Sequence, residues 1–281
     1  MPETAYVAPD RSRIEPLVVS ALRTAGHCAE PKSWRWIEHG SANLVVLAGD
    51  VAVRVGRTAA ASAQSVRAQQ LIDGLPALPF AVPRAVVDPL WDGDMVAVVQ
   101  RRLDGIPHPG GHGEPAALET LLDALEDARI AELAPHLATP HAFMGAQRWH
   151  AVMVDEAIPL LAPAARDAAR RAADALADLA PVRPVLVHGD LAGSNVLWHE
   201  GAVSGVIDWD LATAGDPAID VAALAVWHGW DVIARVRPAE VVRRARVIAA
   251  THPLQVLCFT IVDRRPEPER LRAAERASAR M

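Results

Sequence analysis

One segment of this chain constrains its fold more than any other, because His188, Asp190, Asn195 and Asp208 surround a pair of apolar strands. Residues 187–195 read Val-His-Gly-Asp-Leu-Ala-Gly-Ser-Asn, and residues 206–210 read Val-Ile-Asp-Trp-Asp. Between these motifs, residues 196–198 and 203–207 have the composition of strands, and the intervening His-Glu-Gly is typical of a turn. The sequence therefore predicts a hairpin whose open end brings the Asn of the first motif close to the first Asp of the second.

The first motif has the H-x-D-x-x-x-x-N spacing of a phosphoryl-transfer loop, with His188, Asp190 and Asn195 at the fixed positions. Such a loop directs a carboxylate at an acceptor hydroxyl and an amide oxygen at Mg²⁺. We therefore predict Asp190 as the catalytic residue, and Asn195 and Asp208 as ligands of Mg²⁺, which prefers hard oxygen ligands. The alternative is a turn residue, a cap and a polar strand end, but the joint occurrence of all these features favours the kinase-like interpretation.

Length and composition set broad limits. The chain has 281 residues, 51% of them hydrophobic, which is enough for one large domain or two lobes. Its cysteines, Cys28 and Cys258, fit no metal-binding cluster and are expected to be reduced. We predict a cytoplasmic protein, because the N-terminus has no secretory pattern and no apolar run approaches membrane-spanning length. The net charge of −6 disfavours nucleic acid as a partner and is compatible with a cationic small molecule; no membrane or obligatory protein partner is implied.

The patterns divide the chain into two predicted lobes, residues 1–103 and residues 104–281, with a loop rich in Pro, Gly and His at the boundary. In the first lobe we predict a hairpin around a Gly-Asp turn, a helix and a further strand, at residues 43–47 with 51–55, 60–72 and 95–99. The second lobe is predicted to be mainly helical, with helices at residues 115–133, 164–179, 217–230 and 238–250.

Three motifs together resemble those of the aminoglycoside phosphotransferase family. They are His188 to Leu191 with Asn195, Ile207 to Asp210, and Gly215 to Pro217 with Asp220. Within that family, residues 53–60 and 193–198 are most similar to the viomycin and capreomycin phosphotransferases. The resemblance implies a two-lobed protein-kinase-like α+β fold, with a small β-rich N-terminal lobe and a larger, mainly helical C-terminal lobe.

The resemblance also implies that ATP or GTP binds with Mg²⁺ between the lobes. Ser41 lies in the turn at residues 38–43 that would cover the nucleotide, although an ordinary hairpin loop is the alternative. Arg54 stands where the family has a phosphate-binding Lys, and it keeps the positive charge while offering a planar fork of donors. Gln100 and Arg102 belong to the segment that would follow the adenine.

One family feature is missing. Residues 65–71 carry no acidic side chain where the family has a helix Glu that pairs with the phosphate-binding cation. Either Gln69 or Gln70 orients Arg54 by hydrogen bonding, or another carboxylate holds it, or the nucleotide alone does. The choice between ATP and GTP stays open for the same reason.

The remaining candidates are supporting residues and acceptor-binding residues. His188 is expected to brace the catalytic loop, and Asp216 and Asp220 to cap the following helix or anchor that loop. The candidates for binding the acceptor are Asp210, Trp227 and Trp230. The alternatives are a solvated charge for the Asp and ordinary helix packing for the two Trp.

Motifs and resemblance together predict an ATP-dependent antibiotic O-phosphotransferase, which transfers the γ-phosphoryl group to a hydroxyl of a cationic antibiotic and so confers resistance. Tuberactinomycins such as capreomycin or viomycin rank ahead of aminoglycosides as the acceptor. Two alternatives remain open: a metabolite kinase acting on choline, homoserine or a sugar, and a non-catalytic nucleotide-binding regulatory module. Acceptor choice resides in helices and loops of the second lobe, which the motifs do not specify.

Overall fold

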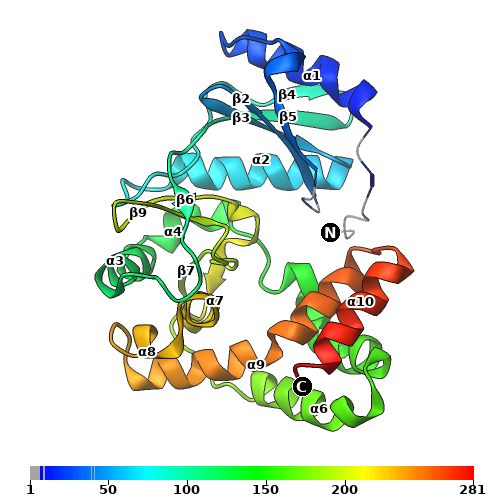
Figure 1. Cartoon of the computed structure of the whole chain (residues 1–281), viewed down its shortest axis with the longest axis vertical. Helices are drawn as coiled ribbons and strands as arrows, with labels where there is room; N and C mark the ends of the chain where they lie inside the picture. The colour runs from blue at the N-terminus through cyan, green and yellow to red at the C-terminus, as the bar shows by residue number, and fades with distance from the viewer. Residues whose placement is uncertain (1–6, 9, 39, 41) are drawn as a thin grey trace.

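The computed structural model describes residues 7–8, 10–38, 40 and 42–281. Its N-terminal region, residues 11–101, is an antiparallel sheet of five strands between two helices, with strand order β1-β2-β3-β5-β4. Helix α1 covers one face of this sheet and α2 covers the other (Figure 1). We call this the sheet region; its elements are α1 (Arg11–Thr24), β1 (Arg35–Ile37), β2 (Asn43–Ala48), β3 (Val51–Gly56), α2 (Ala59–Gly74), β4 (Leu90–Asp92) and β5 (Met95–Arg101).

The predicted first hairpin is confirmed as β2 and β3, which pair in antiparallel register around the Gly-Asp turn. The predicted helix and the next strand are confirmed as α2 and β5. Successive side chains of a strand point to opposite faces. Val53 and Val55 of β3 pack in the cluster formed with α1, so Arg54 between them faces the α2 side. This alternation is what delivers a cation to the interior of the molecule.

The remainder of the chain is mainly helical, with two small antiparallel sheets of order β6-β8-β9 and β10-β7. We call it the helical region (Figure 1). Its strands are β6 (Ile106–Pro107), β7 (Val185–Val187), β8 (Val196–His199), β9 (Ala202–Val206) and β10 (Thr213–Gly215). Its helices are α3 (Pro115–Glu126), α4 (Ile130–Leu133), α5 (Trp149–Ala151), α6 (Pro163–Ala177), α7 (Ala218–His228), α8 (Trp230–Ile233), α9 (Ala239–Val262) and α10 (Glu267–Ser278).

The predicted helix at residues 164–179 is confirmed as α6, but three other helix boundaries were wrong. The first predicted helix is two helices, because Arg129 leaves the helical region of backbone space with ψ 85°. The helix predicted to reach Trp230 ends at His228, since Gly229 has φ 103°. The last predicted helix continues to Val262 through Pro253. Leu254 and Leu257 beyond that proline are fully buried, so packing outweighs the missing N–H.

Helix α9 also corrects the expectation that no apolar run approaches membrane-spanning length. It has 24 residues, an 18-residue window within it reaches a mean hydropathy of 1.4, and among the described residues it is the one helix long and apolar enough to cross a membrane. The helix packs against α6, α7 and α10, and it supplies residues to two buried clusters. These contacts are those of a core helix.

The predicted second hairpin is confirmed as β8 and β9, joined at Glu200 and Gly201, which both have positive φ. The sheet region is attached to it by backbone hydrogen bonds: Ala81 N–H donates to Ser204 O, and Val206 N–H donates to Ala81 O, at 2.9 and 3.0 Å. The segment after α2 therefore fixes the sheet region beside this hairpin. The division into lobes at residue 103 remains a prediction.

Candidate active site

A cleft of about 2180 Å³ lies between the sheet region and the helical region. Its lining includes Arg54 and Arg67 from the sheet region, and Asp190, Asn195, Asp208 and Asp210 from the helical region. The motifs that the sequence analysis singled out are therefore gathered at one cavity.

The loop after β7, residues 188–195, is the predicted catalytic loop, and buried hydrogen bonds hold it in place. The N–H groups of His188 and Gly189 donate to the two carboxylate oxygens of Asp220 in α7, at 2.7 and 2.9 Å. The His188 ring is fully buried against Trp209, and Nε2–H donates to Ile207 O at 3.0 Å while Nδ1 accepts from Asp190 N–H at 3.2 Å. Burial lowers the pKa of His188 to about 4, so the ring is neutral and its two nitrogens brace the loop.

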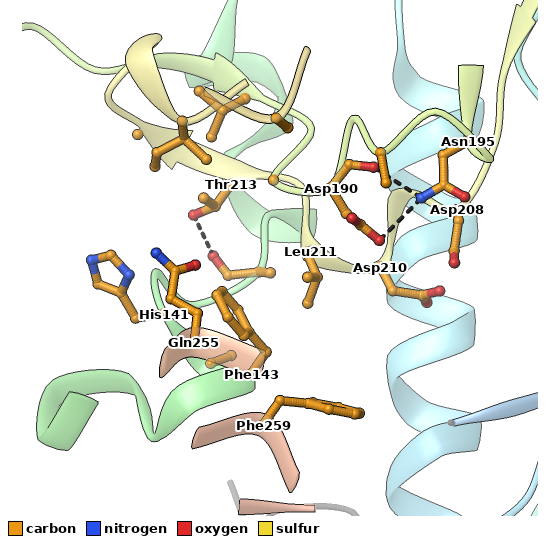
Figure 2. A pocket seen from close by; sticks show the side chains of 18 of the residues that line it. His141, Phe143, Asp190, Asn195, Asp208, Asp210, Leu211, Thr213, Gln255 and Phe259 are labelled. Carbon is orange, nitrogen blue, oxygen red and sulfur yellow. Dashed lines mark hydrogen bonds between the residues drawn. The ribbon is translucent and has the colours of Figure 1, made fainter. Parts of the chain in front are cut away.

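Asn195 joins the Asp190 carboxylate to the start of the hairpin. Its Nδ2 donates to Asp190 O at 2.9 Å and to Asp190 Oδ2 at 3.0 Å, and its backbone O accepts from Ile207 N–H at 3.0 Å. Burial raises the pKa of Asp190, and the Asn195 hydrogen bond opposes that rise. Because Nδ2 is used in this way, Oδ1 is the atom that Asn195 can offer to a cation (Figure 2).

The oxygen donors fit Mg²⁺. Half of the Asp208 side chain, 51%, is exposed, and it lies beside Asn195 (Figure 2). Loss of water and then repulsion from Asp210 raise the pKa of Asp208, and the positive charge of Arg54, which both carboxylates contact, opposes that rise. Asp210 Oδ1 is buried without a hydrogen-bond partner. A divalent cation would relieve this excess of negative charge. No group of three His, Cys, Asp or Glu side chains suited to a metal occurs in the described residues, so water and phosphate oxygens would complete the coordination.

Arg54 is held by carboxylates of the helical region. Its Nη2 donates to Asp210 Oδ2 and, at 3.4 Å, to Asp208 Oδ1. No hydrogen bond joins Gln69 to Arg54 in the described residues: Gln69 Oε1 accepts from Gln100 Nε2 at 2.6 Å, and its amide donates to Asp73 and Pro83. Of the three alternatives for what orients Arg54, the structure therefore supports the second: carboxylates outside α2 hold it.

The other nucleotide candidates lie apart from one another. Gln100 is buried and bonded to α2 through Gln69, whereas Arg102 is exposed and donates to Gly49 O at 3.1 Å. Both residues line the cleft. Ser41 lies outside the described residues.

The supporting residue Asp216 and the two acceptor candidates Trp227 and Trp230 lie in different places. Asp216 accepts from Ala218 N–H at the start of α7 and from the Arg244 guanidinium of α9. The Trp227 indole lies on Gly193 of the catalytic loop, donates to His108 O at 2.9 Å and lines the cleft. Trp230 does not line the cleft; its ring stacks with the Arg246 guanidinium 4.3 Å away.

A second wall of the cleft had no counterpart among the sequence candidates. Figure 2 shows this wall facing the side that carries Asp190; it comprises His141, Phe143, Thr213, Gln255 and Phe259. These side chains come from the loop before α5, from β10 and from the part of α9 beyond Pro253. They have no common spacing in the sequence. The one available signal was the continuation of α9, which the boundary prediction missed.

A family model described as the phosphotransferase enzyme family matches residues 33–257. This range includes the loop of residues 188–195 as well as Arg54 and its partners, Asp208 and Asp210. The chain belongs to this family. The predicted resemblance is thereby confirmed at the level of the family.

Individual members of the phosphotransferase family show how far the likeness extends. Viomycin phosphotransferase of Streptomyces vinaceus is 42% identical over 85 residues, which are 29% of this chain and 30% of that protein. Hygromycin-B 4-O-kinase of Escherichia coli is 33% identical over 94 residues, 34% of this chain and 25% of that protein. The matches thus span less than a third of these relatives.

A solved structure shows the fold over nearly the whole chain. The GDP complex of aminoglycoside 2'-phosphotransferase-IIIa superposes with a TM-score of 0.79 at 16% identity, covering 97% of this chain and 98% of that one. The protein-kinase-like α+β fold is confirmed.

Proposed function

We propose that this chain is a nucleotide-dependent antibiotic O-phosphotransferase, which transfers the γ-phosphoryl group of ATP or GTP to a hydroxyl of a cationic antibiotic. A tuberactinomycin such as viomycin or capreomycin is the first choice of acceptor, and an aminoglycoside is the second. The phosphorylated antibiotic would bind its target poorly, so the activity would confer resistance.

One observation carries this proposal: Asp190 is fixed beside Asn195 and Asp208 in a cleft that also contains Arg54. Asp190 would orient the acceptor hydroxyl and take its proton, while Arg54 would hold phosphate oxygens. Mg²⁺, held by Asn195 Oδ1 and Asp208, would supply neutralisation of phosphate charge. Positioning and electrostatics account for most of the rate enhancement in this chemistry, so the rigid bonding of the loop supports the assignment.

The second wall of the cleft supports an acceptor that combines rings, polar groups and positive charge. Phe143 and Phe259 line the cleft with aromatic rings, which attract ammonium groups as well as apolar surface; the Arg265 guanidinium already lies over the Phe259 ring, 5.6 Å from its centroid. The two acidic residues of the lining outside the catalytic motifs already have arginine partners, Asp216 with Arg244 and Asp263 with Arg265. We therefore propose that aromatic contact and Asp190 itself, rather than a row of free carboxylates, receive the acceptor.

Protein partners and nucleic acid have no part in this proposal. We also propose a cytoplasmic location, where nucleotide is available and where Cys28 and Cys258, which are free, would stay reduced.

The test incubates purified protein with ATP or GTP, Mg²⁺ and one acceptor at a time: viomycin, capreomycin, kanamycin, hygromycin B, choline or homoserine. Mass spectrometry then detects the addition of one phosphoryl group. Product with viomycin or capreomycin, and none with choline or homoserine, is the expected result. Product with only the metabolites would replace the proposal by a metabolite kinase, and nucleotide binding without any product would favour a regulatory module.

A further inference from the structure

We propose that Asp210 is the positioning residue for Arg54, so that an ion pair between the helical region and the sheet region aligns the phosphate-binding guanidinium with the proposed Mg²⁺ ligands, Asn195 and Asp208. The inference rests on the proposed use of a nucleotide by this cleft. In protein kinases the corresponding cation is held by a Glu on the helix of its own lobe. Here the geometry assigns that task to a residue 156 positions away in the sequence.

The burial of Arg54 requires a fixed partner. Only 7% of Arg54 is exposed, and the side chain of Asp210 is 21% exposed. Burying a guanidinium without a carboxylate would cost several kcal/mol, so an arginine at this place needs a counter-charge in the folded protein. Burial by itself would lower the pKa of Arg54, but Asp210 and then Asp208 raise it, which keeps the charge in place.

No carboxylate of helix α2 pairs with Arg54. Its one acidic residue is Asp73, near its C-terminal end, where Oδ1 accepts from Gln69 Nε2 at 2.9 Å and from Ala85 N–H at 3.0 Å. Gln69, the nearest substitute for the missing Glu, is engaged with Gln100. The usual partner within the sheet region is therefore absent both in sequence and in contact.

Helix α2 instead fixes Asp210 from a second direction. The Arg67 guanidinium donates to the backbone O of Asp210 and to the backbone O of His136, each at 2.7 Å. The side chain of Asp210 is bound by Arg54 of β3 and its backbone by Arg67 of α2, so the sheet region contacts this one residue at two points. That double attachment distinguishes Asp210 from Asp208, whose backbone receives no such contact from Arg67.

A positioning role has a consequence that a metal-ligand role lacks. If Asp210 acts through Arg54, removal of either side chain abolishes the same contribution to nucleotide affinity, and removal of both costs no more than removal of one. If Asp210 acts as a metal ligand through its unpartnered Oδ1, its loss adds to the loss of Arg54 and changes the Mg²⁺ requirement.

The experiment measures the Kd for ATP and for GTP in Mg²⁺, and the Mg²⁺ concentration that gives half-maximal nucleotide binding. It uses the full chain and the variants Asp210→Asn, Arg54→Met and the double variant. Asp123→Asn is the matched control, because Asp123 also pairs with a buried arginine, Arg237, and neither residue lines the cleft. Asp210→Glu keeps the carboxylate and tests rescue, and Arg54→Lys probes the pair from the other side if Asp210→Asn does not fold.

We expect each single substitution to raise the nucleotide Kd about tenfold, the loss being that of one charge-assisted hydrogen bond. The double variant should have the same Kd as the single variants. The Kd values of Asp210→Glu and of the Asp123→Asn control should stay within about threefold of that of the unmodified protein. The Mg²⁺ concentration for half-maximal nucleotide binding should not change in any variant. Arg54→Lys should lose part of the affinity, since it keeps the charge without the fork.

Three results would overturn this inference and leave the proposed function standing: losses of nucleotide affinity that add in the double variant, a changed Mg²⁺ requirement, or a Kd for Asp210→Asn that is unchanged or lower. If the unmodified protein binds neither ATP nor GTP, the proposed function fails and this inference fails with it.

Discussion

The loop of residues 188–195, which we propose is catalytic, and strand β3, whose Arg54 we propose binds phosphate, meet in one cleft, but they are stabilised by different kinds of contact. In the loop, the partners lie close in sequence: Asn195 is 5 residues from Asp190, and Asp220 is 32 residues from His188. In the strand, Arg54 finds its carboxylates 154 and 156 residues away. The loop is thus assembled by its own segment, whereas the setting of Arg54 depends on how the two regions are joined.

This difference predicts two classes of variant. Substitutions around the catalytic loop should impair phosphoryl transfer or folding and leave nucleotide affinity largely intact. Substitutions at Arg54 and its partners should act first on nucleotide affinity.

Asp208 provides the strongest challenge to this separation, because it contacts Arg54 and also belongs to the loop side. We expect Asp208→Ala to lower kcat about 10³-fold, since a metal ligand is lost. The nucleotide Kd of this variant should also no longer depend on the Mg²⁺ concentration. A variant whose Mg²⁺ titration matches that of the unmodified protein would remove Asp208 from the metal site.

Gly193 tests how tightly the loop is fitted. A Cβ at this position would overlap the Trp227 indole, so Gly193→Ala should displace the loop and lower kcat about 100-fold. Nucleotide Kd should change little. The added Trp227→Ala substitution makes room and should recover about tenfold of the loss. Full activity of Gly193→Ala, or no recovery in the double variant, would show that this contact does not position the loop.

His188 makes the loop sensitive to acid. Its folded pKa of about 4 lies below the ordinary histidine value of 6.5, so the folded state binds fewer protons than the unfolded state between these pH values. The stabilisation is therefore complete above pH 6.5 and is lost as the pH falls toward 4. His188→Asn should lower the free energy of unfolding by about 2 kcal/mol near pH 7.5, through the loss of buried hydrogen bonds.

Urea unfolding of both proteins from pH 4 to 8 measures this difference, with His199→Asn as the control because the His199 side chain is 70% exposed. The difference between His188→Asn and the unmodified protein should shrink toward the acid end. A difference independent of pH would mean that His188 is not a neutral brace.

Trp230 should show the smallest effect. Because it stacks on Arg246 outside the cleft, Trp230→Leu should leave the KM for the acceptor within about twofold and cost about 1 kcal/mol of stability. Trp227→Leu, at the cleft, should change kcat. A large rise in KM for Trp230→Leu would return this residue to the acceptor site.

The sequence predicted the elements whose signals are local. The Gly-Asp turn between two apolar runs identified β2 and β3, and the motifs on both sides of the second hairpin placed Asn195 and Asp208 at its open end. Helix α1 was not predicted, because Pro16 interrupts its pattern even though Asp10 caps its start through Ser12 N–H. Local signals also failed at Pro253, where burial of the following leucines keeps α9 helical.

The long-range contacts were out of reach for a physical reason. No spacing rule relates Arg54 to Asp210, since their meeting depends on the packing of the sheet region against the β8–β9 hairpin. Asp210 was considered for the acceptor, and its contact is with Arg54 in this structure. The wall with Phe143 and Phe259 likewise combines separate segments whose residue types are ordinary for a core.

The most direct test of the central claim measures nucleotide Kd and phosphoryl transfer on one preparation of Asp190→Ala beside the unmodified protein. Asp190 lies in the loop, and no hydrogen bond or ion pair joins it to Arg54 in the described residues, so its loss should leave the Kd within about threefold and lower transfer to the accepted antibiotic about 10³-fold or more. Transfer that survives in Asp190→Ala would contradict the assignment of this carboxylate as the catalytic residue.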